Sequence, residues 1–196
     1  MMPSSVTPEM VLKAVLARRS CVRLTEPGPT RVELEALVQA AATAPDHGRL
    51  RPWRLIPVTG HERGRLGDVL GEAAATPQQA QRAAVNVLRA PMLLSIVLCP
   101  VPDHPTVPEW EQLAATAAMV TTLTLLLDSR GWSSIWRTGP AVEAPQVRKH
   151  LGIGDEEKLL GWLYTGTRPS TETVRERRPL DVSTKINWAY APPVGP

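Results

Sequence analysis

The stretch from Pro108 to Arg130 constrains the fold more than any other part of this chain. Its apolar residues, Leu113, Val120 and Leu127 among them, leave no continuous polar side. A helix of this kind must be buried on all sides, in a core or in a subunit interface. Its uncharged part, 112–127, is shorter than the roughly 18 apolar residues that a membrane span needs. We therefore expect a buried helix and no membrane partner.

The other periodic segments alternate between helix and strand. The run 92–98 (MLLSIVL) is unbroken, which predicts a strand buried on both faces. Thr30-x-x-Glu33 forms a capping box at the start of a second helix. Helices interleaved with strands in this way predict an α/β or α+β layered fold. We expect helices at 8–19, 30–44, 62–75, 78–88, 108–130 and 145–151, and strands at 53–58, 92–98, 132–136 and 159–165.

The 196 residues fit one domain followed by an extended tail. From Arg168 to Pro196 the chain is polar, contains proline and has no clear period, so this tail must lie on another surface or be loose. The first 20 residues lack the pattern of a secretory signal, and Cys21 and Cys99 form no C-x-x-C motif. We expect a cytoplasmic protein without disulfides.

The positive charge is too weak and too scattered to favour nucleic acid as a partner. The formal net charge is +3, from 22 Lys and Arg against 19 Asp and Glu. No long basic run occurs. Because 18 of the 22 cations are arginine, the positions of the arginines along the chain indicate more about function than the net charge does.

The familiar catalytic motifs are missing. The chain has no phosphate-binding G-x-x-x-x-G-K-[ST], no H-E-x-x-H and no G-x-S-x-G. Cys99, His104 and Glu109 are loosely spaced like metal ligands, but four prolines among them favour a rigid loop. We therefore expect neither a metal site nor a catalytic triad.

Two local clusters remain. Arg18-Arg19-Ser20 closes the first helix, where cations complement the helix dipole, yet two guanidinium groups beside a hydroxyl also suit a phosphate or carboxylate. Without further information, the helix-dipole interpretation of Arg18 and Arg19 is favoured over an anion site. The second cluster, 44–53, is either a surface connection or a shaped binding loop. Its Asp46 and His47 are adjacent and cannot easily pair as orienting group and base.

The order of these clusters resembles the nitroreductase family of FMN-dependent oxidoreductases, particularly its small members. A helix ending in Arg-Arg-Ser is followed by a helix, by A-P-D-H-x-x-x-x-P-W and by a strand. Three later pieces match as well. The resemblance runs from about residue 10 to 168 and includes His104-x-x-Val107-Pro108-x-Trp110-Glu111-Gln112, Gly131-x-x-x-Ile135-Trp136-Arg137-Thr138-Gly139 and Gly161-x-Leu163-Tyr164-x-Gly166-Thr167.

The resemblance implies an α+β fold of three layers, a central mostly antiparallel sheet flanked by helices, with a long dimer-interface helix. It implies one domain over 1–196, whose segment 168–196 packs on the partner subunit of a homodimer. The implied activity is ping-pong hydride transfer from NADH or NADPH through FMN to a nitroaromatic, quinone or similar acceptor. No side chain is assigned as catalytic, since flavin chemistry belongs to the cofactor.

The resemblance also implies a set of cofactor-binding residues. Arg18 and Ser20 would contact the FMN phosphate and ribityl chain, with Arg19 alongside. His47 would approach the flavin from one subunit, and Trp136, Arg137 and Thr138 from the other. Arg177 and Arg178 would close over the phosphate. Arg137 or Arg49 would be the cation that stabilises the negative charge of the reduced flavin. Two plainer interpretations stay open: Trp136 as a core residue, and Arg137 as a surface ion pair.

Three positions depart from the family pattern. Val22 stands where a basic residue is usual, with Arg23 one position later, and Arg49 and Arg51 replace amides in the loop before Pro52. Cations in place of amides can change the flavin potential or weaken FMN binding. A relative that binds or sequesters FMN without reductase turnover is therefore the alternative.

Overall fold

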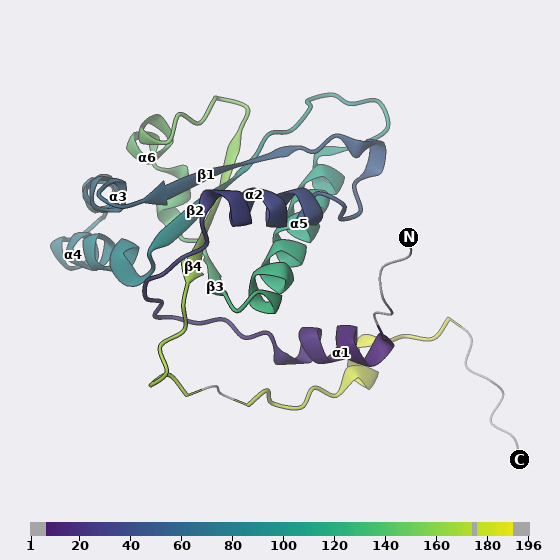
Figure 1. Cartoon of the computed structure of the whole chain (residues 1–196). Coiled ribbons are helices and arrows are strands. Elements are labelled where there is room, and N and C mark those ends of the chain that lie inside the picture. Colours follow the sequence, from purple (N-terminus) through teal and green to yellow (C-terminus); the bar gives the residue numbers. More distant parts are fainter. Residues whose placement is uncertain (1–6, 174–175, 190–196) are drawn as a thin grey trace, which may run out of the picture.

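Four antiparallel strands form the centre of the fold (Figure 1). The computed structural model describes residues 7–173 and 176–189. The strand order is β1-β2-β4-β3, so β1 and β3 are the two edges of the sheet. Every residue of β2 is buried, as its unbroken apolar run predicts. The strands are β1 (Trp53–Thr59), β2 (Met92–Leu98), β3 (Ser133–Arg137) and β4 (Lys158–Gly166).

Helices cover both faces of this sheet and complete three layers. Helices α2 and α5 pack on one face around Leu94, Leu123 and Leu163. Helices α3, α4 and α6 lie on the other, around Leu66 and Val147. This confirms the expected α+β class. The helices are α1 (Pro8–Ala17), α2 (Arg31–Ala41), α3 (Glu62–Glu72), α4 (Pro77–Asn86), α5 (Glu109–Ser129) and α6 (Pro145–His150).

All the expected helices and strands are present, with ends that differ by up to three residues. The capping box is formed as predicted: the Thr30 hydroxyl accepts from the Glu33 amide at 3.3 Å, and the Glu33 carboxylate accepts from the Thr30 amide at 2.9 Å. The helix it opens ends at Ala41, because the chain turns before Pro45. Short 3-10 turns are found at His47–Arg49, Val87–Arg89, Pro140–Glu143 and Val182–Lys185.

Helix α5 is buried along one side and exposed along another. Its buried polar side chains tie neighbouring loops to it: Gln112 donates to the carbonyls of Val101 and Val107, and Thr116 donates to that of Pro52. Trp110 is 68% exposed. Over the described residues α5 is the one helix long and apolar enough to cross a membrane by length and composition. Its packing against α2 and β2 is that of a core helix.

Helix α1 lies outside the three layers, where it contacts α5 and has the C-terminal segment beside it (Figure 1). None of its residues is buried, although Met10, Leu12 and Leu16 are apolar. Arg177 joins the two by donating to the carbonyl of Arg18 at 2.9 Å. Residues 1–6, 174–175 and 190–196 of the expected domain and tail lie outside the described residues.

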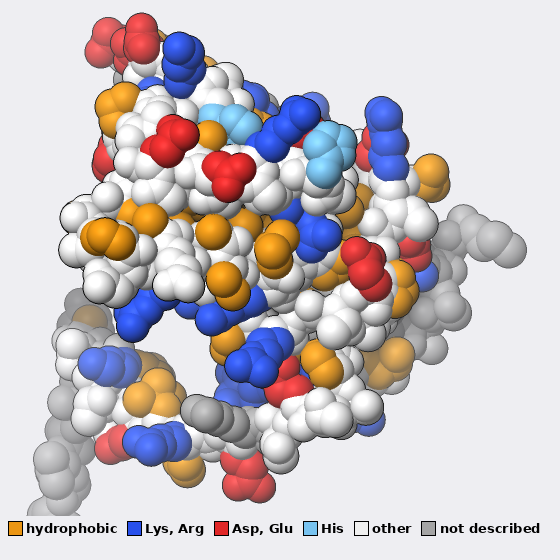
Figure 2. Space-filling model, turned by 90° about the vertical axis from the view of Figure 1, so that its left-hand side faces the viewer, with side chains coloured by type: hydrophobic (Ala, Val, Ile, Leu, Met, Phe, Trp, Pro, Cys, Tyr) orange, Lys and Arg blue, Asp and Glu red, His pale blue; other side chains and the backbone are white. Residues whose placement is uncertain are grey.

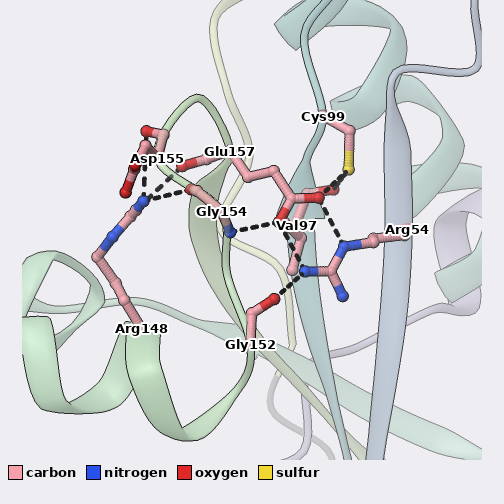
Figure 3. Close-up of polar contacts among 8 residues, drawn as sticks. All are labelled: Arg54, Val97, Cys99, Arg148, Gly152, Gly154, Asp155 and Glu157. Atoms are coloured by element: carbon pink, nitrogen blue, oxygen red, sulfur yellow. Dashed lines mark hydrogen bonds and ion pairs between the residues drawn. The ribbon is translucent and has the colours of Figure 1, made fainter.

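A bidentate ion pair fastens β1 to the loop that leads into β4 (Figure 3). Arg54 Nε and Nη2 donate to the two carboxylate oxygens of Glu157, each at 2.7 Å. The same carboxylate accepts from the amide of Gly154 at 2.8 Å and from the thiol of Cys99 at 3.1 Å. Arg148 donates to the Glu157 carbonyl at 3.0 Å. This network joins β1, the residue that follows β2 and the loop before β4. The Glu157 carboxylate is its centre.

Replacing Glu157 with glutamine should lower the free energy of unfolding at pH 7 by about 2 kcal/mol. The hydrogen bond from Arg54 holds the pKa of Glu157 at about 2, below the ordinary 4.5. A depressed pKa in the folded state stabilises the fold above the unfolded-state pKa, and this contribution disappears as the pH falls from about 4.5 towards 2. Urea denaturation at pH 7 and pH 3 should show the gap between parent and E157Q shrinking in acid.

The control is Glu35→Gln, which breaks an exposed pair with Arg31 on α2. Exposed pairs contribute little, so its effect should stay within about 0.5 kcal/mol at both pH values. Equal losses in the two variants would contradict the assigned role of Glu157.

Candidate functional site

An arginine-lined hollow lies where α1 ends and the C-terminal segment leaves the sheet. It has a volume of about 740 Å³, and we call it the arginine hollow. Figure 2 shows Lys and Arg side chains around the opening between the main body and the limb formed by α1 and the C-terminal segment. The residues that define the hollow by charge or polarity are Arg19, Ser20, Arg23, Arg168 and Glu172.

The free edge of β3 brings these distant residues together. Ser20 forms a parallel bridge with Ser134, and the amide of Cys21 donates to the Ser134 carbonyl at 3.2 Å. Five residues later Thr25 pairs with Thr167, just past the end of β4. The segment after α1 therefore runs along the sheet edge. Arg168 follows directly and donates to the Arg19 carbonyl at 3.4 Å.

The contacts of the Arg-Arg-Ser cluster support its role at the end of α1, and its role as a phosphate or carboxylate site stays a prediction. The Arg19 guanidinium turns back to the end of α1 and donates to the carbonyls of Ala17 and Arg18, at 3.2 and 3.0 Å. Cations in this position complement the helix dipole. Arg19 and Ser20 nevertheless also line the hollow, whereas Arg18 does not. The tail brings Arg177 to this end of α1, and Arg178 is exposed beside it.

A second cavity of about 500 Å³ lies between α4 and the end of β3, and we call it the α4 cavity. Arg137 extends into it, with its guanidinium carbon 5.9 Å from the ring centre of Tyr164. Arg137 Nη1 and Trp162 Nε1 are buried, and neither has a hydrogen-bond partner among the described residues. Buried donors without acceptors are costly, so the cavity is suited to a ligand with electronegative edges. Thr138 lines the same cavity, as do Arg82 and Asn86 of α4.

Trp136 and Arg137 point to opposite faces of the sheet, as neighbouring residues of a strand do. The Trp136 indole donates to the Leu160 carbonyl at 3.0 Å, and the residue is 37% exposed. It is therefore not a core residue. Arg137 is half-buried and has no ion pair among residues 7–173 and 176–189. The plainer interpretation of each residue is wrong.

The loop before β1 carries His47 and Arg49 at the other edge of the sheet. The carboxylate of Asp46 accepts from the amides of Leu50 and Arg51, at 3.3 and 2.7 Å. Arg49 and Arg51 adopt left-handed φ values of 54° and 48°, which non-glycine residues rarely take. Because β1 and β3 are opposite edges, one chain does not bring this loop to the arginine hollow.

His47 has an ionisable partner that is distant in sequence. Its Nδ1 lies 2.7 Å from Glu111 Oε2, in the first turn of α5. Sequence reasoning considered only Asp46 as an orienting group, and Asp46 binds backbone amides instead. Glu111 lies in the segment 104–112, which matches the family pattern, but the spacing of that segment does not indicate a contact with His47.

Neither cysteine is available as a nucleophile. Burial, and then hydrogen bonding to Glu172, raises the pKa of Cys21 to about 11. Burial and Glu157 raise the pKa of Cys99 to about 11 in the same way. Both thiols are therefore protonated at neutral pH, and thiolate chemistry is unsupported. In the described part of the chain no three His, Cys, Asp or Glu side chains gather as a metal site.

Comparison with known proteins gives consistent matches. The model of the nitroreductase family matches residues 15–167. YdjA of Escherichia coli (strain K12), named provisionally as an NAD(P)H nitroreductase, is 34% identical over 160 residues. That alignment covers 80% of this chain and 87% of YdjA.

Solved structures agree on the fold. The nitroreductase-like family protein from Bacillus cereus superposes with a TM-score of 0.81 at 21% identity, covering 96% of this chain and 100% of that one. NfnB from Sphigopyxis sp. strain HMH, described as an FMN and NADPH-dependent nitroreductase, gives a TM-score of 0.72 at 22% identity. It covers 92% of this chain and 99% of its own.

Proposed function

The chain belongs to the nitroreductase family, and from this premise we propose that it is an FMN-dependent oxidoreductase. It takes hydride from NADH or NADPH and passes it, in ping-pong fashion, to a nitroaromatic, quinone or similar acceptor. The single observation that carries the proposal is the buried Arg137 Nη1, which has no hydrogen-bond partner among the described residues and lies at the α4 cavity. NfnB is described as FMN and NADPH-dependent, which supports the same cofactors.

We assign the arginine hollow and the α4 cavity to the two ends of a flavin nucleotide. The arginine hollow offers Arg23 and Arg168 to a phosphate, for which guanidinium groups are well suited, beside Arg19, whose guanidinium also binds the end of α1. The α4 cavity offers buried N–H donors from Arg137 and Trp162, which would suit the electronegative edge of a ring. Strand β3 connects the two: Ser134 forms a bridge with Ser20 of the arginine hollow, and the strand ends at Arg137 of the α4 cavity.

The protein's own contribution is binding, orientation and charge. When bound, the flavin supplies the hydride chemistry, so no side-chain nucleophile is required. Arg137 would stabilise negative charge on the reduced ring, in keeping with a cation held in a half-buried site. Arg49 remains the second candidate for that role, from the partner subunit.

A homodimer explains the exposed apolar surface. Helix α1 has no buried residue, and the α5 residues Trp110 and Leu113 are exposed. Isolated helices of this length are marginal in water, so α1 requires a covering surface. We propose one domain whose C-terminal segment, from Arg168 onward, packs with α1 on a second copy. The loop of His47 and Arg49 would then approach that copy's flavin.

Colour and bleaching test the function directly. The purified protein should be yellow and should bleach without oxygen when NADH or NADPH is added. A colourless protein that takes up no added FMN would contradict the proposal. A yellow protein that never bleaches with either nucleotide would support the alternative, a relative that sequesters FMN.

Arg168→Ala should weaken FMN binding about fivefold, because it removes a charge-assisted donor from the arginine hollow. The measurement is quenching of FMN fluorescence as cofactor-free protein is titrated. Arg65→Ala is the control, since Arg65 lies on α3 and pairs with Glu62 at 2.9 Å. Equal affinities in R168A and R65A would remove the phosphate assignment.

A further inference from the structure

The pair formed by His47 and Glu111 is the one contact of the loop before β1 that neither the cofactor sites nor the fold explains. The imidazole Nδ1 is 2.7 Å from the carboxylate, and the two side chains are 60% and 28% exposed. The carboxylate thus fixes one ring nitrogen. The other, Nε2, has no hydrogen-bond partner among the described residues.

This geometry has the form of an oriented acid. A carboxylate that accepts from Nδ1–H sets the tautomer and stabilises the imidazolium, which leaves Nε2–H free to donate. Histidine is the side chain whose ordinary titration range best suits proton transfer near neutral pH. The loop is also stiff, because the Asp46 carboxylate binds two of its amides and the Pro52 carbonyl accepts from Thr116 and Cys99.

We propose that His47 is the proton donor to the electron acceptor and that Glu111 is its positioning residue. The proposal rests on the proposed function, because the loop must reach the flavin of a second copy. The apolar surface of α5 supports that placement: Trp110 and Leu113, on either side of Glu111 in sequence, are exposed. A second copy covering this surface would also enclose His47.

The chemistry balances for a quinone. NAD(P)H supplies, through the cofactor, a hydride that forms a bond to one carbonyl oxygen. The Nε2–H bond of the imidazolium breaks, and its proton joins the other oxygen. The quinone is reduced to a hydroquinone, the dihydronicotinamide is oxidised, and the neutral imidazole is reprotonated by solvent.

Few other charges face the imidazole. On α5, Glu109 is paired with Lys158, which leaves Glu111 as the acidic group directed at His47. On its own loop, Asp46 is held by backbone amides, and Arg49 is exposed. Glu111 is therefore the acidic group that orients the imidazole.

Separate measurement of the two half-reactions tests the proposal. In anaerobic stopped flow, His47→Asn should slow reoxidation of the reduced protein by a quinone about 100-fold, while reduction by NAD(P)H stays within about twofold. Added imidazole should partly restore H47N. Glu111→Gln should also slow reoxidation and leave reduction within about twofold, because the imidazole loses the carboxylate that orients it.

A second readout needs no cofactor. In nitrogen-detected NMR of the cofactor-free protein, Glu111→Gln should change the ring-nitrogen chemical shifts of His47, which report whether Nδ1 or Nε2 carries the proton. The matched control is His61→Asn, because His61 also pairs with a glutamate, Glu62, at 2.9 Å on exposed α3. H61N should leave both half-reactions unchanged.

Three outcomes would overturn the assignment: an unchanged reoxidation rate in H47N, equal slowing of both half-reactions, or His47 ring-nitrogen shifts insensitive to Glu111→Gln. If NAD(P)H never reduces the parent, the proposed function fails separately. Reoxidation can then still be measured after chemical reduction with dithionite.

Discussion

Gly161→Ala should destabilise the protein by about 3–5 kcal/mol, more than any other single change considered. Gly161 is buried in β4 with φ +110°, a region that L side chains rarely adopt. A Cβ there would lie 2.3 Å from the Arg137 carbonyl oxygen and 3.2 Å from the Thr138 Cα. Both obstacles are backbone atoms, so the clash cannot be relieved by a rotamer change. Urea denaturation would measure the loss.

The control is an alanine at a glycine with space around it. Gly64 lies inside α3, and a Cβ added to it would have no neighbouring atom within 4 Å. Gly64→Ala should therefore stabilise the protein by about 0.5–1 kcal/mol through helix propensity. A loss below about 1 kcal/mol in G161A would show that the β3 and β4 backbones are not held as close as described.

Arg137→Met should weaken FMN binding about 30-fold and leave the cofactor-free fold almost unchanged. The guanidinium has a buried nitrogen without a partner among the described residues, so its removal costs only the contact with Tyr164, about 1 kcal/mol. In the complex the same nitrogen would donate to the flavin, and losing a hydrogen bond to a charged donor costs about 1.5–3 kcal/mol. FMN titration and urea denaturation of the cofactor-free protein measure the two quantities.

Arg130→Met is the matched control, since Arg130 is an exposed arginine at the end of α5. It should change neither quantity. If R137M destabilises the cofactor-free protein by several kcal/mol, Arg137 is a structural residue. If FMN affinity is unchanged, the α4 cavity does not hold the ring.

The architecture was predictable because each element carries its own local signal. The apolar run 92–98 requires a strand buried on both faces, and Thr30 with Glu33 fixes the start of α2 through neighbouring backbone atoms. Element ends were less certain, since chain turns such as the one after Ala41 also depend on the residues beyond the helix. The resemblance to the family also pointed to Arg19, Ser20, Arg137 and Thr138, all of which line one of the two cavities.

The pairings within the site were not predictable, because they join residues far apart in the chain. Glu111 lies 64 positions after His47, and Arg168 lies 149 positions after Arg19. Glu172 enters the arginine hollow from a segment without periodicity and binds the Cys21 thiol at 3.0 Å. The face to which Arg137 points depends on the register of β3 against β4, which composition does not determine.

The proposed cover of helix α1 by a second copy would make protein concentration a variable in every cofactor titration. Its ten residues are all exposed in a single chain, yet its last turn leads directly into Arg19 and Ser20 of the arginine hollow. By mass action, a surface that covers α1 also stabilises Arg19 and Ser20 in the arginine hollow. A ligand bound in the arginine hollow in turn favours the state in which α1 is covered. Apparent FMN affinity should therefore rise as the protein becomes more concentrated. Trp188, 81% exposed in the C-terminal segment, offers a fluorescence signal for the same equilibrium upon dilution.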